Sequence, residues 1–282
     1  MPTRRTTNCS GVGLARSDLY ADEHHWGDRA IDLTAHDLPA LKARYLVRAL
    51  PDRGRVVEIG CGSGRVLNTV ARHRPHLELH GCDIRTVERP ATFEFRVVDP
   101  DVPDLPYETN SVDVAILYDV LEHLHDPAAS LAAAHRILRP GGHLISFTPL
   151  EGQPFSFYRC YRRVLGADLY LDTKEHIQAF SERSLLAIVE PWFRVVDREY
   201  AYHFIGHCMD ATLFALMKIP AVRRRFWNEN PYYVEGETAA GSTPSSFGRV
   251  LSVANALAEL ESRLLRHVRW GAAGLLFTAE AR

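Results

Sequence analysis

A short apolar run leads directly into a turn with three glycines. The run is Val56–Ile59, it follows the turn residues Pro51–Gly54, and the glycines are Gly60, Gly62 and Gly64. Glycines after a buried strand let the backbone turn tightly and approach a bound nucleoside, which a Cβ would obstruct. Many α/β proteins use such a loop only to join a strand to a helix. The segment therefore predicts an α/β fold and leaves cofactor binding and a plain turn as alternatives.

The spacing of these glycines distinguishes between two kinds of cofactor. The dinucleotide fingerprint is G-x-G-x-x-G, whereas here Gly64 comes one residue early and Arg65 stands where the third glycine belongs. An adenosine without a pyrophosphate needs no helix N-terminus aimed at two phosphates, so the tighter turn suffices for it. The spacing disfavours an NAD-dependent oxidoreductase, which we keep as a rival hypothesis.

Further strand candidates follow at the spacing of β-α-β units. A parallel sheet covered by helices on both faces is the arrangement that buries such strands. We therefore divide the chain into an N-terminal helical cap (residues 1–50), a core (51–202), a helical insertion (203–270) and the last strand of the core (271–282). The expected strands are Leu77–Cys82, Phe93–Val98, Val112–Leu117, His143–Phe147, Phe193–Tyr200 and Gly274–Ala279.

The insertion contains an apolar stretch, Phe204–Ile219, and the pattern of a long amphipathic helix. Apolar residues in this helix recur every three or four positions, which places them on one face, and charged residues face away from them. The apolar residues are Val250, Val253, Leu257, Leu260, Leu264 and Val268, and the charged ones are Glu259, Glu261, Arg263 and Arg266.

Charge and composition exclude several classes of protein. The net charge is −2, so the chain lacks the broad positive field expected of a nucleic-acid binder. The five cysteines are odd in number and form no C-x-x-C pair, which fits reduced thiols in a cytoplasmic protein. No apolar run approaches the roughly 20 residues of a membrane span, and the first residues do not read as a secretory signal.

Two acidic residues stand where a nucleoside would need them. Asp83 follows the second expected strand, where a carboxylate can accept both hydroxyls of a ribose; an ordinary surface Asp is the alternative. Glu58 lies inside the first strand, where an unpaired charge would be costly to bury. We expect Glu58 to meet a partner near a methionyl amine, or else to be a satisfied structural carboxylate.

Four linked segments resemble one family, the class I S-adenosylmethionine-dependent methyltransferases, in the small-molecule branch that includes ubiquinone-type O-methyltransferases. Their order and spacing match over about Val56–Pro149, and Phe180-Ser181 and Phe193–Val196 extend the likeness to the sixth strand. The segments are Val56–Gly64, Leu79–Asp83, Asn110–His123 and Leu138–Leu144. The resemblance implies a Rossmann-like α/β sheet of seven strands in the order 3-2-1-4-5-7-6, with the last strand antiparallel.

The resemblance also implies a place for S-adenosyl-L-methionine. It puts the glycine turn around the methionine moiety and ribose, Asp83 on the ribose, Ile84 against the adenine and Asp99 on the adenine amino group. The segment after the third strand is longer and richer in proline than the family's usual turn, so Asp101 is an alternative to Asp99. The expected cofactor-binding residues are Glu58, Gly60, Cys61, Gly62, Gly64, Asp83, Ile84, Asp99, Tyr118 and Asp119.

The expected catalytic residues follow the fourth strand, beside the transferable methyl group. His123 is the candidate general base, although Glu122-His123 is typical of the family and a structural role is the alternative. Tyr118 is the second candidate, with ordinary packing as its alternative. Other histidines that fit a base are His24, His25, His125, His176 and His203.

The sequence gives little support for metal binding or for membrane contact. His203 and His207 are four residues apart, but no H-E-x-x-H motif accompanies them, so no metal is expected. The run Arg223–Trp227 suits an anionic membrane surface, but solvated basic turns are common, so we do not expect membrane contact.

The sequence thus predicts methyl transfer by in-line displacement to an oxygen or nitrogen of a small, partly apolar molecule. The large insertion favours specialised metabolism. A non-catalytic nucleoside-binding protein is a second rival, beside the oxidoreductase. No segment identifies the acceptor or the oligomeric state.

Overall fold

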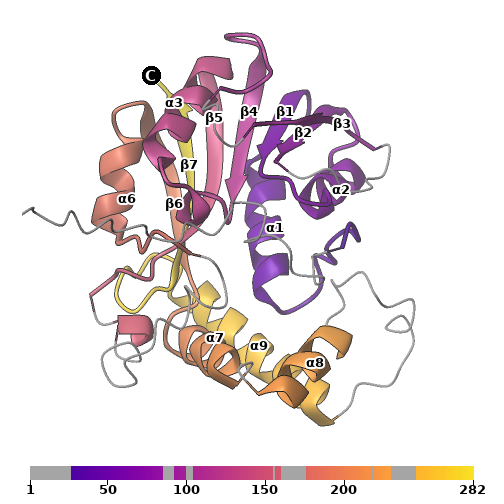
Figure 1. Cartoon of the computed structure of the whole chain (residues 1–282), viewed down its shortest axis with the longest axis vertical. Coiled ribbons are helices and arrows are strands. Elements are labelled where there is room, and N and C mark those ends of the chain that lie inside the picture. Colours follow the sequence, from indigo (N-terminus) through magenta and orange to yellow (C-terminus); the bar gives the residue numbers. More distant parts are fainter. Residues whose placement is uncertain are drawn as a thin grey trace, which may run out of the picture.

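The apolar runs of the sequence come together in one sheet in the computed structural model of the chain (Figure 1). The structure describes residues 27–84, 92–99, 104–154, 156–159, 176–216, 219–229 and 246–282. Within these residues the sheet has seven strands, in the order β3-β2-β1-β4-β5-β7-β6. Strand β7 is antiparallel to both of its neighbours, whereas the other adjacent pairs are parallel. The predicted strand order and the antiparallel last strand are confirmed.

The strand bounds agree with the predicted ones to within two residues, except in β5. There the predicted strand began at His143, whereas β5 begins at Leu138 because Leu138 pairs with Val112 of β4. The register then shifts, since Val114 pairs with His143, and the Pro-Gly-Gly segment forms an irregularity inside the strand. The strands are β1 Gly54–Ile59, β2 Leu77–Asp83, β3 Glu94–Val97, β4 Val112–Tyr118, β5 Leu138–Pro149, β6 Phe193–Ala201 and β7 Gly274–Ala281.

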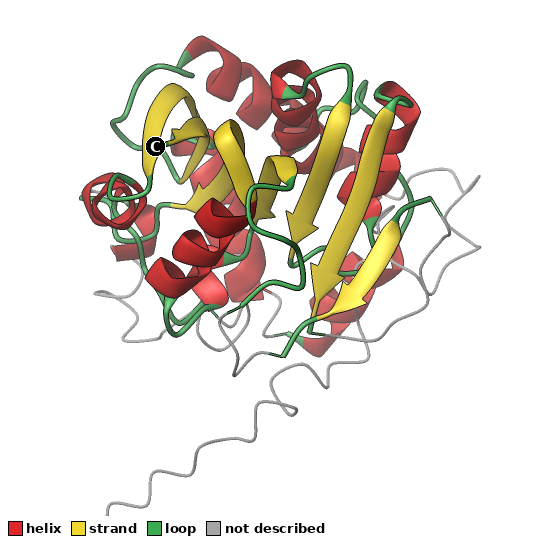
Figure 2. Ribbon diagram, turned by 90° about the horizontal axis from the view of Figure 1, so that it is seen from above, coloured by secondary structure: helices red, strands yellow, loops and turns green. Residues whose placement is uncertain are grey.

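Helices cover both faces of the sheet (Figure 2). Several begin at side-chain caps: Asp37 accepts from the Ala40 amide, Asp126 accepts from the Ala129 amide, and Ser181 forms a capping box with Ser184. The helices are α1 Leu38–Ala49, α2 Arg65–His73, the 3-10 turn η1 Leu121–His123, α3 Pro127–Ile137, α6 Glu182–Val189, α7 Phe204–Leu216, α8 Pro220–Glu229 and α9 Ser246–Leu264.

Strand β4 shows how the core divides between the two faces. Successive side chains of a strand point to opposite sides. Leu117 packs in the cluster that holds Leu131 of α3, while Ile116 packs in the cluster that holds Leu46 of α1 and Leu67 of α2. The near-continuous apolar sequence of β4 is therefore that of a central strand buried on both sides.

Helix α1, which lies within the predicted N-terminal cap, packs directly on the sheet. Tyr45 is 1% exposed, and its hydroxyl lies 3.1 Å from Oγ1 of Thr278 in β7. Residues 1–26 of the predicted cap lie outside the described residues.

The insertion packs at the edge where the parallel strands end. Helix α7 follows β6 at that edge, and α7, α8 and α9 lie together below the sheet (Figure 1). The Glu261 carboxylate of α9 accepts the Phe204 and Ile205 amides at 3.0 and 2.8 Å, which ties α9 to the first turn of α7. Within the described part of the chain, no helix combines the length and apolar character that a membrane crossing requires.

Helix α9 is amphipathic, but its orientation differs from the one that the pattern indicates. The apolar stripe is exposed, with Val250 at 70% and Leu264 at 75%, whereas Glu259 is 2% exposed. The Glu259 carboxylate forms ion pairs with His36, with Arg44 of α1 and with Arg263. These contacts turn the carboxylate inward, so the prediction that Glu259 faces away was wrong. The predicted helix also ended too late, because α9 ends at Leu264, before Val268.

This orientation predicts effects of different size on stability for two neighbouring substitutions. Glu259→Gln should lower the free energy of unfolding by about 1.5–3 kcal/mol, since it weakens charge-assisted hydrogen bonds. Leu257→Gln, at a position that is 50% exposed, should change it by less than about 0.5 kcal/mol. Urea denaturation followed by circular dichroism measures both. A larger loss from Leu257→Gln than from Glu259→Gln would show that the apolar face is the packed one.

Candidate functional site

The carboxyl ends of β1, β2 and β4 meet at one edge of the sheet. The amides of Gly60 and Cys61 both donate to the carbonyl of Cys82, at 2.8 and 3.1 Å. The Asp119 amide donates to the carbonyl of Phe147 at 3.1 Å, which joins the end of β4 to β5. Three of the four segments that carry the family resemblance therefore end side by side, as the carboxyl ends of adjacent parallel strands must.

The glycine turn adopts the conformation that its composition predicts. Gly60, Gly62 and Gly64 all have positive φ, at 74°, 53° and 89°. A Cβ on Gly64 would collide with the ring of Phe93, while a Cβ on Gly62 would meet no atom of the described residues within 4 Å. Open space therefore borders the backbone of Gly62, where a bound nucleoside needs it.

Asp83 lies against this turn. Its side chain is largely buried, and its Oδ2 atom accepts the Gly62 amide at 2.7 Å. Asp83 thus shapes the glycine turn and stands beside the open space at Gly62. A ribose in that space would meet a carboxylate, the group that its hydroxyls prefer.

Glu58 offers a second acidic contact at the same edge. Burial raises the pKa of Glu58 well above its ordinary range, while the nearby charge of Arg65 acts in the opposite direction. Its Oε2 atom is buried and has no hydrogen-bond partner among the described residues. The ammonium group of a methionyl moiety would supply that partner and stabilise the charged carboxylate, so the residues fit S-adenosylmethionine.

The remaining predicted cofactor residues lie along the same edge. Cys61 is buried within the turn, and Ile84 is partly exposed directly after β2. Asp99 is exposed just beyond Val98, whose amide donates to the Asp83 carbonyl at 3.0 Å. The alternative adenine contact, Asp101, lies outside the described residues.

Tyr118 and Asp119 make contacts of different kinds at the end of β4. The Tyr118 hydroxyl donates to the backbone carbonyl of Lys42 at 3.2 Å, and burial raises its pKa well above the ordinary range, which favours a packing role. Asp119 has a φ of 53°, and its carboxylate forms an ion pair with Lys42 of α1. Burial acts to raise the pKa of Asp119, but Lys42 outweighs it and holds this pKa below its ordinary value.

Two histidines and two carboxylates gather next to Asp119. The rings of His123 and His176 meet edge to face, with centroids 4.8 Å apart. His176 Nδ1 lies 2.7 Å from Oε1 of Glu151, and His176 Nε2 lies 4.0 Å from Oε1 of Glu122. Glu122 is 1% exposed. The structure thus brings the candidate His123 together with one of its alternatives, His176.

The other candidate histidines lie elsewhere. His125 is exposed, and His203 Nε2 lies 2.7 Å from the carbonyl of Val268. His24 and His25 lie outside the described residues.

A comparison with known proteins decides the family. The profile of the family described as "Methyltransferase domain" matches residues 34–191, which is more than half of the chain. The chain belongs to the class I S-adenosylmethionine-dependent methyltransferases. The predicted resemblance is confirmed, and the rival oxidoreductase is not favoured.

Two curated relatives are similar to parts of the chain. It is 26% identical over 185 residues to a ubiquinone biosynthesis O-methyltransferase of Albidiferax ferrireducens, covering 61% of this chain and 69% of that one. It is 36% identical over 141 residues to an uncharacterised 37.1 kDa protein in transposon TN4556 of Streptomyces fradiae, covering 46% of this chain but 38% of that one. The chain thus spans well under half of the latter protein.

One solved structure shares the fold and is named for a different reaction. The crystal structure of the [4+2]-cyclase SpnF has a TM-score of 0.53 and 19% identity, and it covers 91% of the methyltransferase and 86% of the cyclase. Because that neighbour is named for a cyclisation, the fold alone does not determine what is done at the edge of the sheet.

Sequence reasoning missed three residues of the methyltransferase site. Lys42 is one of only three lysines in the chain, which was a signal, but its position in α1 gave no reason to place it near β4. Glu122 lies three residues after Asp119 and next to His123, and this grouping of ligand-type residues could have singled it out. Glu151 follows β5 with no recognisable motif.

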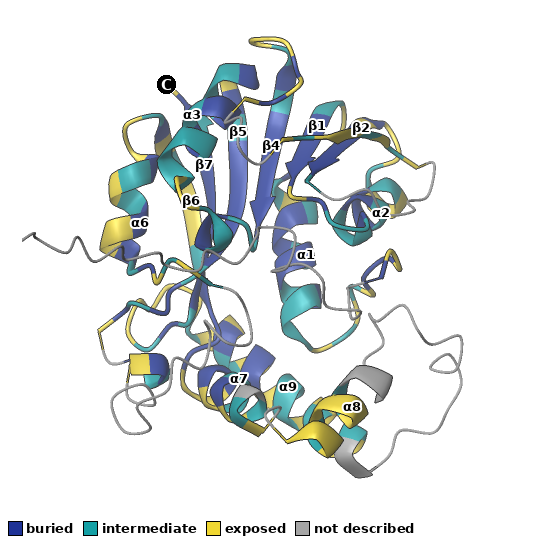
Figure 3. Cartoon of the chain, in the orientation of Figure 1, coloured by how far each residue is buried: buried dark blue, intermediate teal, exposed yellow. Residues whose placement is uncertain are grey.

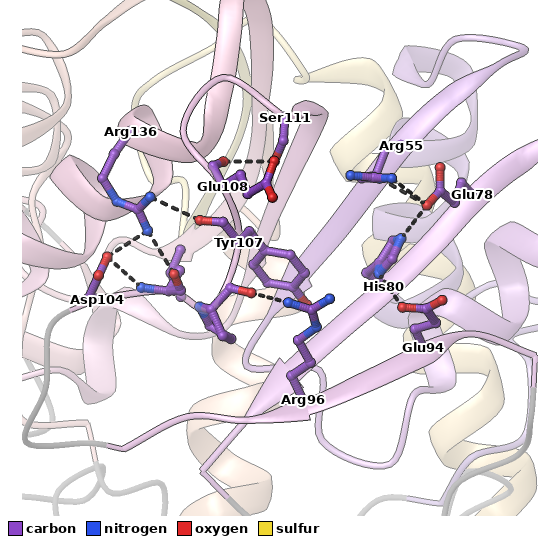
Figure 4. Close-up of a pocket in the computed structure, with 12 residues that line it drawn as sticks. Arg55, Glu78, His80, Glu94, Arg96, Asp104, Tyr107, Glu108, Ser111 and Arg136 are labelled. Carbon is purple, nitrogen blue, oxygen red and sulfur yellow. Dashed lines mark hydrogen bonds and ion pairs between the residues drawn. The ribbon is translucent and has the colours of Figure 1, made fainter.

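A separate hollow of about 580 Å³ lies at the amino-terminal half of β1 and β2 (Figure 4). Its charged lining residues pair with one another: Arg55 with Glu78, and Arg136 with Asp104. The hollow is therefore a solvated charge network away from the glycine turn.

Asp83 should be the side chain whose loss most weakens binding of S-adenosylhomocysteine. Asp83→Asn should lower the affinity about 10- to 100-fold, since hydrogen bonds to a charged group contribute about 1.5–3 kcal/mol. Asp104→Asn, in the hollow of Figure 4, should leave it unchanged. Isothermal titration calorimetry measures both, and equal affinities for the two variants would contradict the placement of the ribose.

Proposed function

We propose that this methyltransferase transfers a methyl group from S-adenosyl-L-methionine to an oxygen or nitrogen of a small, partly apolar molecule. The main support for this proposal is the arrangement of residues at the carboxyl edge of the sheet. The glycine turn, Glu58 and Asp83 lie on one side of it, and the histidine and carboxylate group after β4 lies on the other.

The cofactor side rests on three groups of this chain. Asp83 would bind the ribose, Glu58 would bind the methionyl ammonium, and the space beside Gly62 would admit the nucleoside. When bound, the sulfonium supplies an electrophilic methyl group, whose carbon bonds to the acceptor as the bond to sulfur breaks and leaves its electron pair on sulfur.

The acceptor side rests on the residues after β4 and on the insertion. Holding an acceptor in line with the bond that breaks can lower the activation free energy by roughly 7–11 kcal/mol in favourable cases. The main tasks of the protein are therefore to orient the acceptor and to exclude water. His123 lies in η1, directly beyond the end of β4. Phe157 packs edge to face with Phe204 and His207 of α7, with ring centroids 5.0 and 5.7 Å apart. These rings stand at the start of the insertion, where they would suit an acceptor with an apolar part.

The insertion also supports a dedicated acceptor. Helices α7 and α9, which belong to the large insertion, pack together at the strand ends. On this basis we propose a reaction of specialised metabolism. Arg223–Arg225 of α8 are exposed and would suit an anionic membrane surface, but solvated basic residues are common, so membrane contact is not part of the proposal. Figure 3 shows the exposed surface of α8.

Binding of the cofactor product tests the first half of the proposal. S-adenosylhomocysteine at 100 times its dissociation constant should stabilise the folded protein by about 2.7 kcal/mol, because it binds only the native state. A thermal-shift titration measures this, with NAD as the control ligand. Stabilisation by NAD alone would favour the oxidoreductase.

Transfer of label tests the second half. The protein is incubated with donor carrying a labelled methyl group and with cell extract, and label should appear in small molecules. The matched control is Asp83→Asn, which should lose most of the transfer. Label confined to protein or nucleic acid would contradict the proposed acceptor class, and cofactor binding without any transfer would favour a non-catalytic nucleoside-binding protein.

A further inference from the structure

We propose that Glu122, His123 and His176 bind a divalent transition-metal ion, and that this ion holds the acceptor through two of its oxygen atoms. This inference rests on the proposed function, since it gives the acceptor side of that site its chemistry. It also assigns His123 the role of a metal ligand in place of the general base that the sequence suggested.

The three side chains already have the spacing of a ligand set. One ligand atom from each of Glu122, His123 and His176 lies within 4.8 Å of the others. Two ligands that are each about 2.1 Å from an ion in tetrahedral geometry lie about 3.4 Å apart, so binding requires the farthest pair to close by somewhat more than about 1 Å. Within the described part of the chain, the His203 and His207 pair belongs to no such group of three.

Glu122 has a carboxylate that is almost completely buried. It is 1% exposed, and neither carboxylate oxygen has a hydrogen-bond partner among the residues that the structure describes. A buried acceptor with no donor is costly, and a cation between Glu122 and His176 would remove that cost.

Glu151 orients the ring of His176 for metal binding. Its Nδ1 atom lies 2.7 Å from Oε1 of Glu151, a distance at which the ring donates an N–H to the carboxylate. In a neutral ring that bond leaves the lone pair on Nε2, which faces Oε1 of Glu122 at 4.0 Å. A carboxylate behind a histidine is the usual outer contact of a metal ligand, because it sets the tautomer and orients the ring.

The local charge balance also favours a cation. Asp119, Glu122 and Glu151 supply three carboxylates within this group, and Lys42 pairs with Asp119. In the described part of the chain, the ion pairs of Glu122 and Glu151 both go to His176. A divalent ion would balance the negative charge that these carboxylates gather in a largely buried place.

The ligand types narrow the choice of ion. Two imidazoles and one carboxylate suit Zn²⁺, Fe²⁺ or Co²⁺ better than Ca²⁺ or Mg²⁺, which prefer oxygen ligands. Three protein ligands leave coordination positions open, as in catalytic rather than structural sites.

An ion in this position favours acceptors that offer two neighbouring oxygen atoms. The open positions suit a hydroxyl with a second oxygen on the neighbouring carbon, as in a vicinal aromatic diol. Coordination lowers the pKa of the bound hydroxyl, whose proton passes to water, so the attacking oxygen is already an anion and no protein base is required.

Direct binding of metal tests the inference without relying on activity. Tag-free protein is stripped with a chelator and titrated with Co²⁺ alone, followed by visible absorption and calorimetry. We expect one Co²⁺ per chain in the wild type, binding at least 10-fold weaker in Glu122→Gln and His176→Gln, and 10- to 100-fold weaker in Glu151→Gln. The matched control His125→Gln, at an exposed histidine of the same segment, should bind like the wild type.

Binding of S-adenosylhomocysteine to the same samples separates the two proposals. All variants should retain it, which shows that they are folded. A wild type that binds S-adenosylhomocysteine but no stoichiometric Co²⁺, or equal Co²⁺ binding by Glu122→Gln and wild type, overturns the metal site and leaves the methyltransferase intact. A wild type that does not bind S-adenosylhomocysteine overturns the proposed function instead.

Two isomeric acceptors test the chelation. Transfer of labelled methyl to catechol should depend on the metal and exceed transfer to resorcinol, whose hydroxyls are too far apart to share one ion. Equal transfer to both isomers, unaffected by chelator, contradicts the role of the ion in holding the acceptor.

Discussion

Parallel pairing of β1 with β2 on one side and with β4 on the other determines where the groups of the site lie. Ile59 is in register with Cys82, and Glu58 is in register with Ile116, so the three strands end at nearly the same level. The residues that follow them, the glycine turn, Asp83 and the segment after Tyr118, then emerge at one edge. The strand order reverses direction between β1 and β4. Open α/β sheets bind ligands beyond the carboxyl ends of the strands at such a switch point. Every proposed contact depends on this alignment.

Much of the core could be predicted because its signals are local. Strand β4 is an apolar run bounded by turn residues, and the glycines that follow β1 need positive φ, so each is readable from a few adjacent residues. The order of the strands was not readable from such patterns. It came from the resemblance carried by the linked segments, whose spacing along the chain matches one family.

The remaining features depend on contacts between distant residues. The pattern of α9 shows that the helix has two faces, but only the partners Arg44 and His36 decide that Glu259 turns inward. The acceptor side joins Glu122 after β4 to His176, more than fifty residues further along the chain. No local pattern links these positions, and the two halves of the site therefore differ in how far a single sequence could predict them.

A crystal structure of the protein with S-adenosylhomocysteine bound tests the central claim most directly. We expect the ribose hydroxyls within hydrogen-bond distance of Asp83, the methionyl ammonium beside Glu58, and the sulfur directed toward His123 and the other residues after β4. Binding in the charged hollow of Figure 4, or at the glycine turn with the sulfur directed away from the residues after β4, would contradict it.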